Sequence, residues 1–433
     1  MLKLRQYLKN LAKAVFFPKK TLHSNLSSHQ TEPVDVKQLF QQYSVEELCE
    51  RAEAYYQSLE HWNYHLAIPF SSSDTVAETL NAFVHLLTAL EIAPDMTVLD
   101  FAAGSCWASH WLNQMGCEVI SLDAAPTALK IGQELTRQHP VFGAQPSHSF
   151  LTFHGRTIDL PDKRVDRIIC MDAFHHIPNQ QEVLTEMYRV LKEDGIAGFS
   201  EPGPTHSRSA QAQYEMKHHH VIENDIVLED IFALARQVGF AQCQAAIYHP
   251  FPLLVSLPEF TSFLHNRGFI SASDPSLEYL KHTVAYMCNR RTFVLCKNAA
   301  TLRDSRKREG LTADLHAVIK KTEYHAHEPI ELEAVVANTS DKLWLPATAR
   351  IGAVYLGCHL LNADGTMREF SYYKARLTAD DHPVQPGETL RLELRIPAPA
   401  PGRYLLECDL VSEGVTWFSL NDSFSTRLAV NVR

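Results

Sequence analysis

The feature that most constrains this chain is an apolar run that ends in an acid and a bend of small residues, Val98-Leu-Asp-Phe-Ala-Ala-Gly-Ser-Cys-Trp107. A helical pattern begins at Trp107, directly after the bend. This order predicts a buried strand, a tight turn and the N-terminus of a helix. Small residues let a ligand approach the backbone, and a helix N-terminus presents free N–H groups. The stretch therefore predicts a ligand site at the end of a strand.

A second acid follows at the end of the next apolar run. This run extends from Glu118 to Leu122 and is followed by Asp123. An acid at the end of the second strand of such a unit can accept hydrogen bonds from both hydroxyls of a ribose. The chain lacks a G-x-G-x-x-G fingerprint at this place, which argues against a dinucleotide. The pair of strands therefore predicts a site for a nucleoside.

The motif Asp100-x-Ala-x-Gly-x-Cys, with Asp123 downstream, resembles the nucleoside site of class I S-adenosylmethionine-dependent methyltransferases. Ala102 and Cys106 stand where this family commonly has glycine. The resemblance implies S-adenosyl-L-methionine as the cofactor and an α/β fold, a seven-stranded Rossmann-like sheet with six parallel strands and one antiparallel strand. For Phe70, packing in the core is the alternative to a place over the ligand. The implied cofactor-binding residues are Phe70, Asp100, Phe101, Ala102, Ala103, Gly104, Asp123, Ala124 and Asp172.

The remaining elements follow in the order that the family shows. Further strands are predicted at 149–153, 165–171, 196–200, 245–248 and 291–296, with helical patterns between them. Helices over 36–65 and 76–90 precede the first strand, and in the family such helices cover the cofactor. His154 stands where relatives often carry an acid for the adenine amino group, which leaves the adenine contact open. A helical insertion at about 250–288 is longer than a hairpin needs, and we assign it to acceptor recognition.

The candidate catalytic residues lie near the ends of strands four and five, where open sheets bind ligands. A general base would accelerate transfer to a hydroxyl by about 10²–10⁴-fold. Of His175, His176, Glu201 and His206, we predict Glu201, His206 and His176 as catalytic residues. His176 matches a position that is structural in many relatives, so packing is its alternative role. We predict no metal site, because the adjacent histidines of His218-His-His220 do not share one helix face.

The chain changes character near residue 300. Its 433 residues exceed one usual domain, and the polar stretch 299–310 predicts a linker between a methyltransferase domain, 36–298, and a second domain, 311–433. Apolar residues now alternate, as in Leu390-Arg-Leu-Glu-Leu-Arg-Ile396. Seven or eight short strands with turn signals predict an all-β immunoglobulin-like sandwich.

One stretch of this second domain has a resemblance of its own. The run from Pro401 to Phe418 resembles a module attached to bacterial enzymes and transporters of cell-surface polysaccharide. Trp344 and Trp417 could then form a platform for sugars, and packing in the core or at an edge is the alternative. This resemblance implies a glycan as the partner of the chain.

The N-terminal segment, residues 1–35, is basic and amphipathic. It holds six lysines and arginines before its first acid, Glu32. Residues 1–20 could lie on an anionic membrane, and a solvated helix is the alternative. The net charge of −10 argues against a general nucleic-acid binder, and nine singly spaced cysteines favour a reducing compartment. We therefore expect a cytoplasmic protein, with attachment to the inner face of the membrane left open. The oligomeric state is not predicted.

Three functions are compatible with these patterns. The preferred one is methylation of a sugar hydroxyl of a glycan or of a glycan precursor. The second is methylation of a small natural-product metabolite. The third is a non-catalytic glycan-binding or assembly protein with a vestigial cofactor site, which the departures at Cys106 and His154 favour. The retained Asp100, Gly104 and Asp123 argue against this third function.

Overall fold

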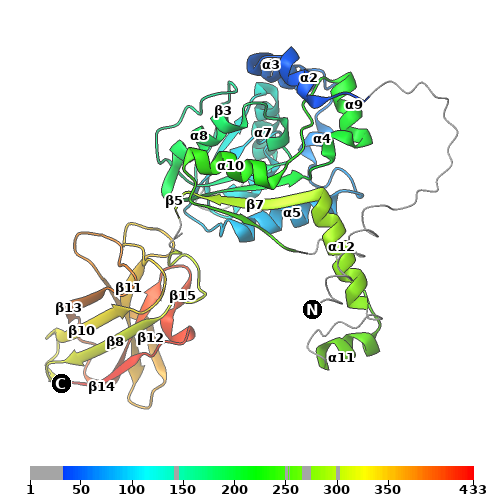
Figure 1. Cartoon of the computed structure of the whole chain (residues 1–433). Helices are drawn as coiled ribbons and strands as arrows, with labels where there is room; N and C mark the ends of the chain where they lie inside the picture. Colours follow the sequence, from blue (N-terminus) through cyan, green and yellow to red (C-terminus); the bar gives the residue numbers. More distant parts are fainter. Residues whose placement is uncertain (1–32, 141–145, 249–251, 253, 266–274, 299–302) are drawn as a thin grey trace. The chain divides into compact units, whose positions relative to one another are not determined.

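The computed structural model describes residues 33–140, 146–248, 252, 254–265, 275–298 and 303–433. The predicted basic helix at 1–20 lies outside these residues. The chain divides into two compact units near residue 300, with two short stretches, 93–96 and 115–117, grouped with the second unit (Figure 1). The fold therefore has the two-part organisation that the change of pattern predicts.

The first unit is built on a seven-stranded sheet in the order β3-β2-β1-β4-β5-β7-β6. All neighbouring strands pair in parallel except those of β7, which is antiparallel to β5 and β6. The prediction of six parallel strands and one antiparallel strand is thus confirmed. The strands are β1 Thr97–Phe101, β2 Glu118–Asp123, β3 His148–Thr152, β4 Val165–Met171, β5 Leu191–Pro202, β6 Gln242–Ala245 and β7 Arg290–Cys296.

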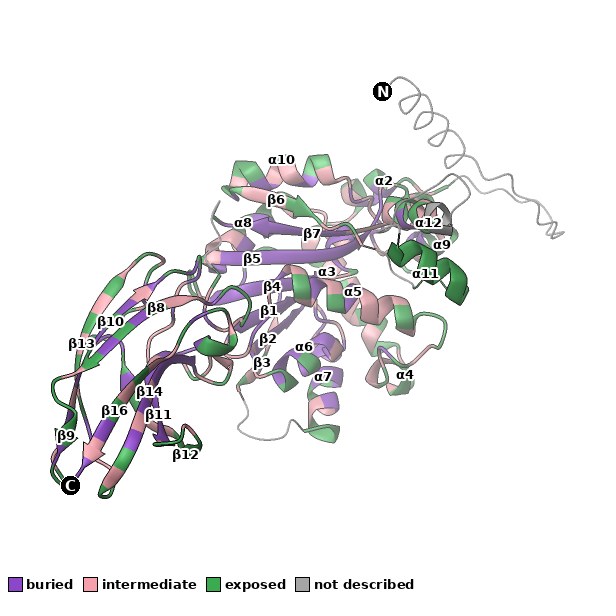
Figure 2. Cartoon of the chain, turned by 90° about the horizontal axis from the view of Figure 1, so that it is seen from below, coloured by how far each residue is buried: buried purple, intermediate pink, exposed green. Residues whose placement is uncertain are grey.

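Helices cover both faces of this sheet, with α8 and α10 on one face and α5 on the other (Figure 1). The central strands are consequently buried along most of their length, as Figure 2 shows for β1, β4 and β5. This double cover is why they read as continuous apolar runs. The helices are α2 Val36–Gln42, α3 Val45–Gln57, α4 Asn63–Leu66, α5 Val76–Ala89, α6 Trp107–Gln114, α7 Pro126–Gln138, α8 Gln180–Val190, α9 Ala210–His218, α10 Leu228–Val238, α11 Leu257–His265 and α12 Pro275–Asn289.

Two strands depart from the prediction by three residues or more at a boundary. Strand β6 lies at Gln242–Ala245 rather than at 245–248. It is an edge strand that pairs with β7 alone, so it tolerates polar side chains and carries a weak apolar signal. The prediction extended this strand to Tyr248, but Tyr248 lies beyond the strand, and the centre of its ring is 3.9 Å from that of His85. Strand β5 begins at Leu191, directly where α8 ends, and not at 196.

The second unit consists of two β-sheets with one shared core. The smaller sheet has the order β13-β10-β8 and the larger β12-β11-β14-β16-β9, with β15 paired to β14. Pairing is antiparallel except between β16 and β9. The strands are β8 Ala313–Ile319, β9 Glu323–Tyr324, β10 Ile330–Asn338, β11 Val354–Asn362, β12 Met367–Arg376, β13 Thr389–Ile396, β14 Gly402–Ser412, β15 Thr416–Trp417 and β16 Thr426–Val432.

The structure bears on the predicted linker and on the two interpretations of Trp344. Ser305 is fully buried, and its hydroxyl donates a hydrogen bond to the carbonyl of Gly352, so residues from 303 onward do not form the predicted linker. Trp344 is also fully buried, edge-to-face with Phe418, and therefore cannot be a platform for sugars. Trp417 is partly buried and contacts the ring of His359 at 4.1 Å.

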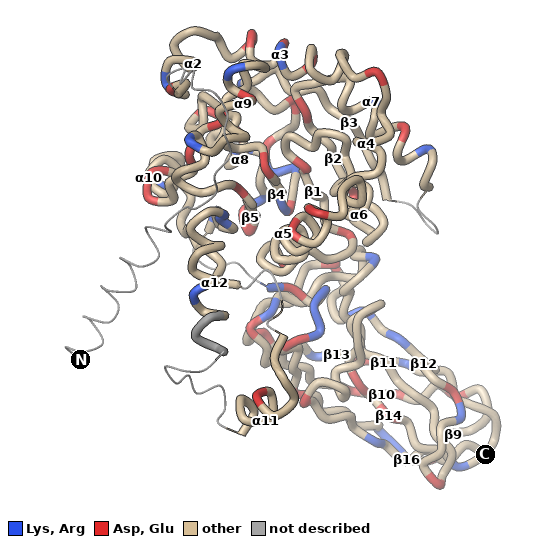
Figure 3. The backbone as a smooth tube through the Cα atoms, turned by 90° about the vertical axis from the view of Figure 1, so that its right-hand side faces the viewer, with Lys and Arg blue, Asp and Glu red and all other residues tan. Residues whose placement is uncertain are grey.

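The surface of the described residues carries both signs of charge, interspersed over helices and strands (Figure 3). Within the same residues, the structure has no helix of the length and apolarity that crossing a bilayer requires. All nine cysteines of the chain lie in the described part, and each is a free thiol.

Candidate functional site

The bend after β1 has an unusual backbone. Ala102, Gly104 and Cys106 adopt positive φ angles of 56°, 53° and 59°. Glycine adopts this left-handed conformation freely, whereas a side chain makes it unfavourable by about 1–2 kcal/mol per residue. This explains why glycine is common at these places in the family that the motif resembles. Ala102 and Cys106 adopt this conformation although each carries a side chain, so the backbone is strained at both residues.

The side chain of Cys106 points away from the ligand side of the bend. It is fully buried against α7, in a cluster with Ala103 and Leu129. A Cβ placed on Gly132 of α7 would lie 2.4 Å from the sulfur of Cys106. Gly132 therefore makes room for Cys106, and this departure from the family pattern leaves the site open.

Asp123 holds the bend in place from the end of β2. One of its carboxylate oxygens accepts the N–H of Gly104 and the other accepts the N–H of Ala125, both at 2.8 Å. Each carboxylate oxygen keeps a second lone pair for a ligand. Burial raises the pKa of Asp123 above its usual value, despite these two hydrogen bonds.

A cavity of about 840 Å³ opens beside this bend. Such a volume is at the upper end of the usual range for small-molecule sites. Six of the nine predicted cofactor residues line it, namely Phe101, Ala102, Gly104, Asp123, Ala124 and Asp172.

The other three predicted cofactor residues do not line the cavity. Asp100 and Ala103 are buried beneath the bend, where Asp100 accepts a hydrogen bond of 2.6 Å from Ser109 on α6. Burial raises the pKa of Asp100 to about 7. Phe70 is 64% exposed and is not among the residues that line the cavity. His154 is exposed and does not obstruct the cavity either.

Residues of helix α3 line the cavity, whereas Phe70 does not. Its lining residues recur at helical spacing and include Arg51, Tyr55 and Tyr56. The hydroxyl of Tyr56 lies 3.2 Å from the Cβ position of Gly104, directly above the bend. The sequence contained this signal, because one face of the helix carries residues 45, 48, 52 and 55. Helix α3 lies within 36–65, where the resemblance implies cover for the cofactor, but amphipathicity alone does not tell which of its residues line a cavity.

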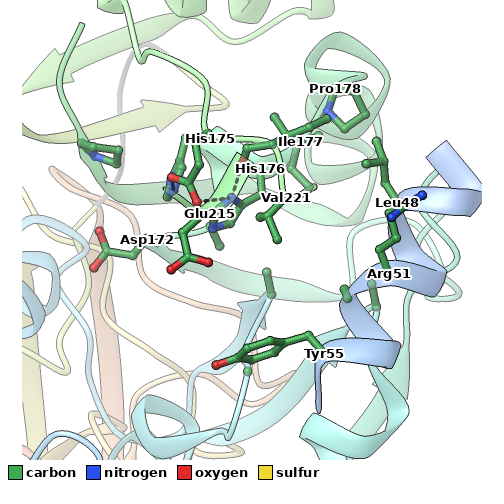
Figure 4. A pocket seen from close by; sticks show the side chains of 18 of the residues that line it. Leu48, Arg51, Tyr55, Asp172, His175, His176, Ile177, Pro178, Glu215 and Val221 are labelled. Carbon is green, nitrogen blue, oxygen red and sulfur yellow. Dashed lines mark hydrogen bonds and ion pairs between the residues drawn. The ribbon is translucent and has the colours of Figure 1, made fainter. Parts of the chain in front are cut away.

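The opposite wall carries a histidine held between two glutamates. His175, in the short turn Phe174–His176 after β4, has its Nδ1 2.7 Å from Glu201 and its Nε2 3.5 Å from Glu223. Burial disfavours the charged ring, but the two carboxylates outweigh it and raise the pKa of His175 to about 9. Figure 4 shows His175 and His176 on the wall across from Tyr55.

Glu201 does not have the predicted catalytic position. It is fully buried and does not line the cavity. Its carboxylate accepts the backbone N–H groups of Ala173, Phe174 and His175, at 2.9–3.3 Å, in addition to the His175 ring. These four hydrogen bonds use the full acceptor capacity of a carboxylate, so Glu201 holds the turn and orients His175.

His176 and His206, the other predicted catalytic residues, both line the cavity. His176 Nδ1 lies 2.5 Å from the carbonyl of Ile222, which fixes the proton on Nδ1 and leaves Nε2 as the basic nitrogen. Burial and the neighbouring His175 lower the pKa of His176 to about 4. His206 Nε2 lies 2.6 Å from Glu223, whose pKa falls to about 2 because its hydrogen bonds to histidines outweigh burial.

An ion pair lies on the same side of the cavity. Arg290, at the start of β7, contacts Asp172 at 2.7 Å, and both line the cavity. The Nε of Arg290 is buried and has no hydrogen-bond partner among the described residues. Arg290 follows directly after α12, most of which belongs to the predicted insertion. Tyr286 and Asn289, near the end of α12, also line the cavity. The prediction of 250–288 for acceptor recognition falls partly outside the described residues.

Comparison with protein families identifies the first unit. Residues 99–199 match the family model described as "Methyltransferase domain". The chain carries a methyltransferase domain. The matched range runs from β1 into β5 and includes the bend, Asp123 and His175, the part of the chain whose motif resembles class I S-adenosylmethionine-dependent methyltransferases.

Curated relatives cover parts of the chain. A demethylmenaquinone methyltransferase of Streptomyces griseus is 28% identical over 132 residues, which is 30% of this chain and 54% of the relative. An arsenite methyltransferase of Mus musculus is 26% identical over 202 residues, 43% of this chain and 52% of the relative. The chain thus spans about half the length of these relatives.

Solved structures are also similar to the chain. The cyclopropane synthase MmaA2 of Mycobacterium tuberculosis has a TM-score of 0.40 at 14% identity, covering 57% of this chain and 98% of its own. Phosphoethanolamine N-methyltransferase 2 of Haemonchus contortus, solved with S-adenosylhomocysteine, has a TM-score of 0.39 at 12% identity, covering 59% of each chain.

Proposed function

We propose that the whole chain is an S-adenosylmethionine-dependent methyltransferase that acts on a sugar hydroxyl of a glycan or glycan precursor. The observation that carries the enzymatic part is one cavity that extends from the bend at Gly104 and Asp123 to the polar wall around His176 and Arg290. A donor site and a polar acceptor site in one enclosed space are what methyl transfer requires.

The cofactor fits the residues at the bend. The spare lone pairs of Asp123 would accept the ribose hydroxyls, and Phe153, which also lines the cavity, offers an apolar face to the adenine. Cys106 points into α7 rather than into the cavity, which removes the main argument for a vestigial site.

S-adenosylmethionine, when bound, supplies an activated methyl group to a lone pair of the acceptor. The protein then mainly aligns the acceptor with the methyl group, and orientation of this kind contributes about 7–11 kcal/mol. His176 lines the cavity and its ring is held by the carbonyl of Ile222, so His176 is our candidate to contact the acceptor hydroxyl. The buried Nε–H of Arg290 would donate a hydrogen bond to the acceptor.

Calorimetric titration with S-adenosylmethionine tests the enzymatic part. We expect binding by the wild type and a loss of at least about 100-fold in Asp123→Ala, because two hydrogen bonds to a charged group contribute about 1.5–3 kcal/mol each. Asp159→Ala is the matched control, since Asp159 is an exposed acid outside the cavity. Wild-type protein that binds no cofactor at millimolar concentration would contradict the proposal.

The glycan acceptor rests on the resemblance of residues 401–418 and on the polar lining of the acceptor side. Incubation with labelled cofactor and cell-envelope extracts tests it. We expect the label in a saccharide fraction, and the His176→Gln variant should transfer less. Label found only in lipid or protein would refute the glycan part while leaving the methyltransferase part intact.

A small metabolite is the second candidate acceptor. The volume of about 840 Å³ and the partial cover by α3 favour it, since both suit a small molecule. The two named relatives above are methyltransferases of demethylmenaquinone and of arsenite. Transfer to small-molecule extracts and not to glycans would select this candidate.

The basic segment before Glu32 adds a proposal about location. Its six cationic residues would attract it to an anionic membrane surface. Flotation with anionic liposomes, with and without residues 1–31, tests this. Equal behaviour of the two forms would reject membrane attachment.

A further inference from the structure

We propose that His175, His176 and Glu223 form a binding site for a divalent transition-metal ion at the acceptor end of the cavity. The site brings together two separate parts of the chain, the turn after β4 and the loop before α10. One ligand atom from each of the three residues lies within 4.8 Å of the other two. Sequence spacing could not reveal this site, because 47 positions separate His176 from Glu223.

The distances suit an ion. Two ligand atoms that each lie about 2.1 Å from a tetrahedral ion are roughly 3.4 Å apart. The Nε2 of His175 lies 3.5 Å from a carboxylate oxygen of Glu223. An ion between them would replace this long contact with two metal–ligand bonds. His206, whose Nε2 lies 2.6 Å from the same oxygen, would support the carboxylate from outside.

The surroundings of His175 favour ligation through its Nε2. Metal-binding histidines usually donate their other ring N–H to a carboxylate or a backbone carbonyl, which fixes the tautomer and the ring orientation. His175 Nδ1 contacts the carboxylate of Glu201 at 2.7 Å, and His176 Nδ1 contacts the carbonyl of Ile222 at 2.5 Å. The His175 ring is therefore held in the state that exposes Nε2 to Glu223, and His176 Nδ1 lies 3.7 Å from the other carboxylate oxygen of Glu223. This gives the buried Glu201 a second purpose beyond holding the turn.

The donor set indicates the kind of ion. Imidazole nitrogens favour zinc, iron, copper or nickel, whereas Mg²⁺ and Ca²⁺ prefer oxygen ligands. Three protein ligands leave a position open for a substrate oxygen or nitrogen, and all three residues line the cavity. Figure 4 shows the two histidines side by side on the cavity wall. An ion at this place would bind the acceptor atom directly and polarise it.

Titration of the chelator-treated full chain with Co²⁺, followed by visible d–d absorption, tests the site. We expect one tightly bound Co²⁺ per chain and an affinity at least about tenfold lower in both Glu223→Gln and His176→Gln. Glu201→Gln should also weaken binding by about 10–100-fold, through the orientation of His175. His316→Gln is the matched control, because His316 is an exposed histidine of the second unit.

Cofactor binding by each variant checks that the first unit remains folded, and it separates this proposal from the proposed function. Wild-type protein that binds cofactor but no stoichiometric Co²⁺ would overturn the metal site and leave the methyltransferase proposal intact. Co²⁺ binding of equal strength in wild type, Glu223→Gln and His176→Gln would also overturn it, since the ion would then occupy other histidines of the chain.

Discussion

The contact between Cys106 and Gly132 predicts a substitution whose effect changes sign with its background. A Cβ on Gly132 would lie 2.4 Å from the sulfur and 2.6 Å from the Cβ of Cys106. Gly132 lies inside α7, where alanine is more favourable than glycine by about 1 kcal/mol. Over-packing of a buried site costs about 1–3 kcal/mol. We therefore expect Gly132→Ala to destabilise the wild type by up to about 2 kcal/mol.

In a Cys106→Gly background, both close atoms are absent. The nearest remaining neighbour of the new Cβ is a ring carbon of Phe150 at 3.3 Å. The helix propensity then dominates, and Gly132→Ala should stabilise the protein by up to about 1 kcal/mol. The coupling between the two positions should therefore be about 1–3 kcal/mol, within the range for residues in contact.

Denaturant unfolding of the full chain measures this coupling. The unfolding transition of the first unit can be recognised because its midpoint should move to a higher denaturant concentration when cofactor is added. A Cys117→Ala background is the matched control, because it removes another buried cysteine and keeps the clash. Cofactor affinity should be nearly unchanged in Cys106→Gly. If Gly132→Ala has the same effect in all three backgrounds, the assigned orientation of Cys106 is refuted.

Three further predictions concern the cavity and its support. Gly104→Ala should weaken cofactor binding by about tenfold or more in calorimetry, because φ is 53° and the Tyr56 hydroxyl lies 3.2 Å from the new Cβ; unchanged affinity would contradict this. Burial raises the pKa of Asp100 from 3.8 to about 7, so the folded state holds this proton more tightly and stability falls as pH rises from about 4 to 7. Asp100→Asn should remove this loss of unfolding free energy, which is roughly 4 kcal/mol at most. Urea unfolding at a series of pH values measures it, and a pH profile equal to that of the wild type would contradict the assignment to Asp100. Arg290→Ala breaks the ion pair with Asp172 and should lower the rate of methyl transfer about tenfold or more, while the cofactor affinity stays nearly unchanged. Single-turnover assays measure the rate and calorimetry measures the affinity. Equal losses of rate and affinity would contradict the acceptor-side role of Arg290.

The sequence predicted the donor side well, because its signals are local. The bend from Asp100 to Cys106 is a short run in which residue type follows backbone conformation, and it has the positive φ angles that such a run requires. What the run does not tell is the direction of each side chain. Asp100 and Ala103 belong to the motif, yet both pack beneath the bend instead of lining the cavity.

The acceptor side was predicted less well, because distant segments form it. Glu201 stood at the end of a strand, as a catalytic acid would, but its hydrogen bonds to three backbone N–H groups give it a structural role. His175, which contacts Glu201, is not among the residues predicted as catalytic. Glu223 lies in a loop without a recognisable motif, and only the fold brings it to His175 and His206. The lid was placed at Phe70, whereas the tyrosines of α3 form it.

The most direct test of the central claim is a crystal structure of the full chain with S-adenosylhomocysteine. We predict that both ribose hydroxyls lie within hydrogen-bond distance of Asp123, that the adenine lies against Phe153, and that the sulfur faces the wall of His176. A nucleoside bound elsewhere, or a cavity beside Gly104 that Tyr56 fills in the presence of saturating ligand, would contradict the account.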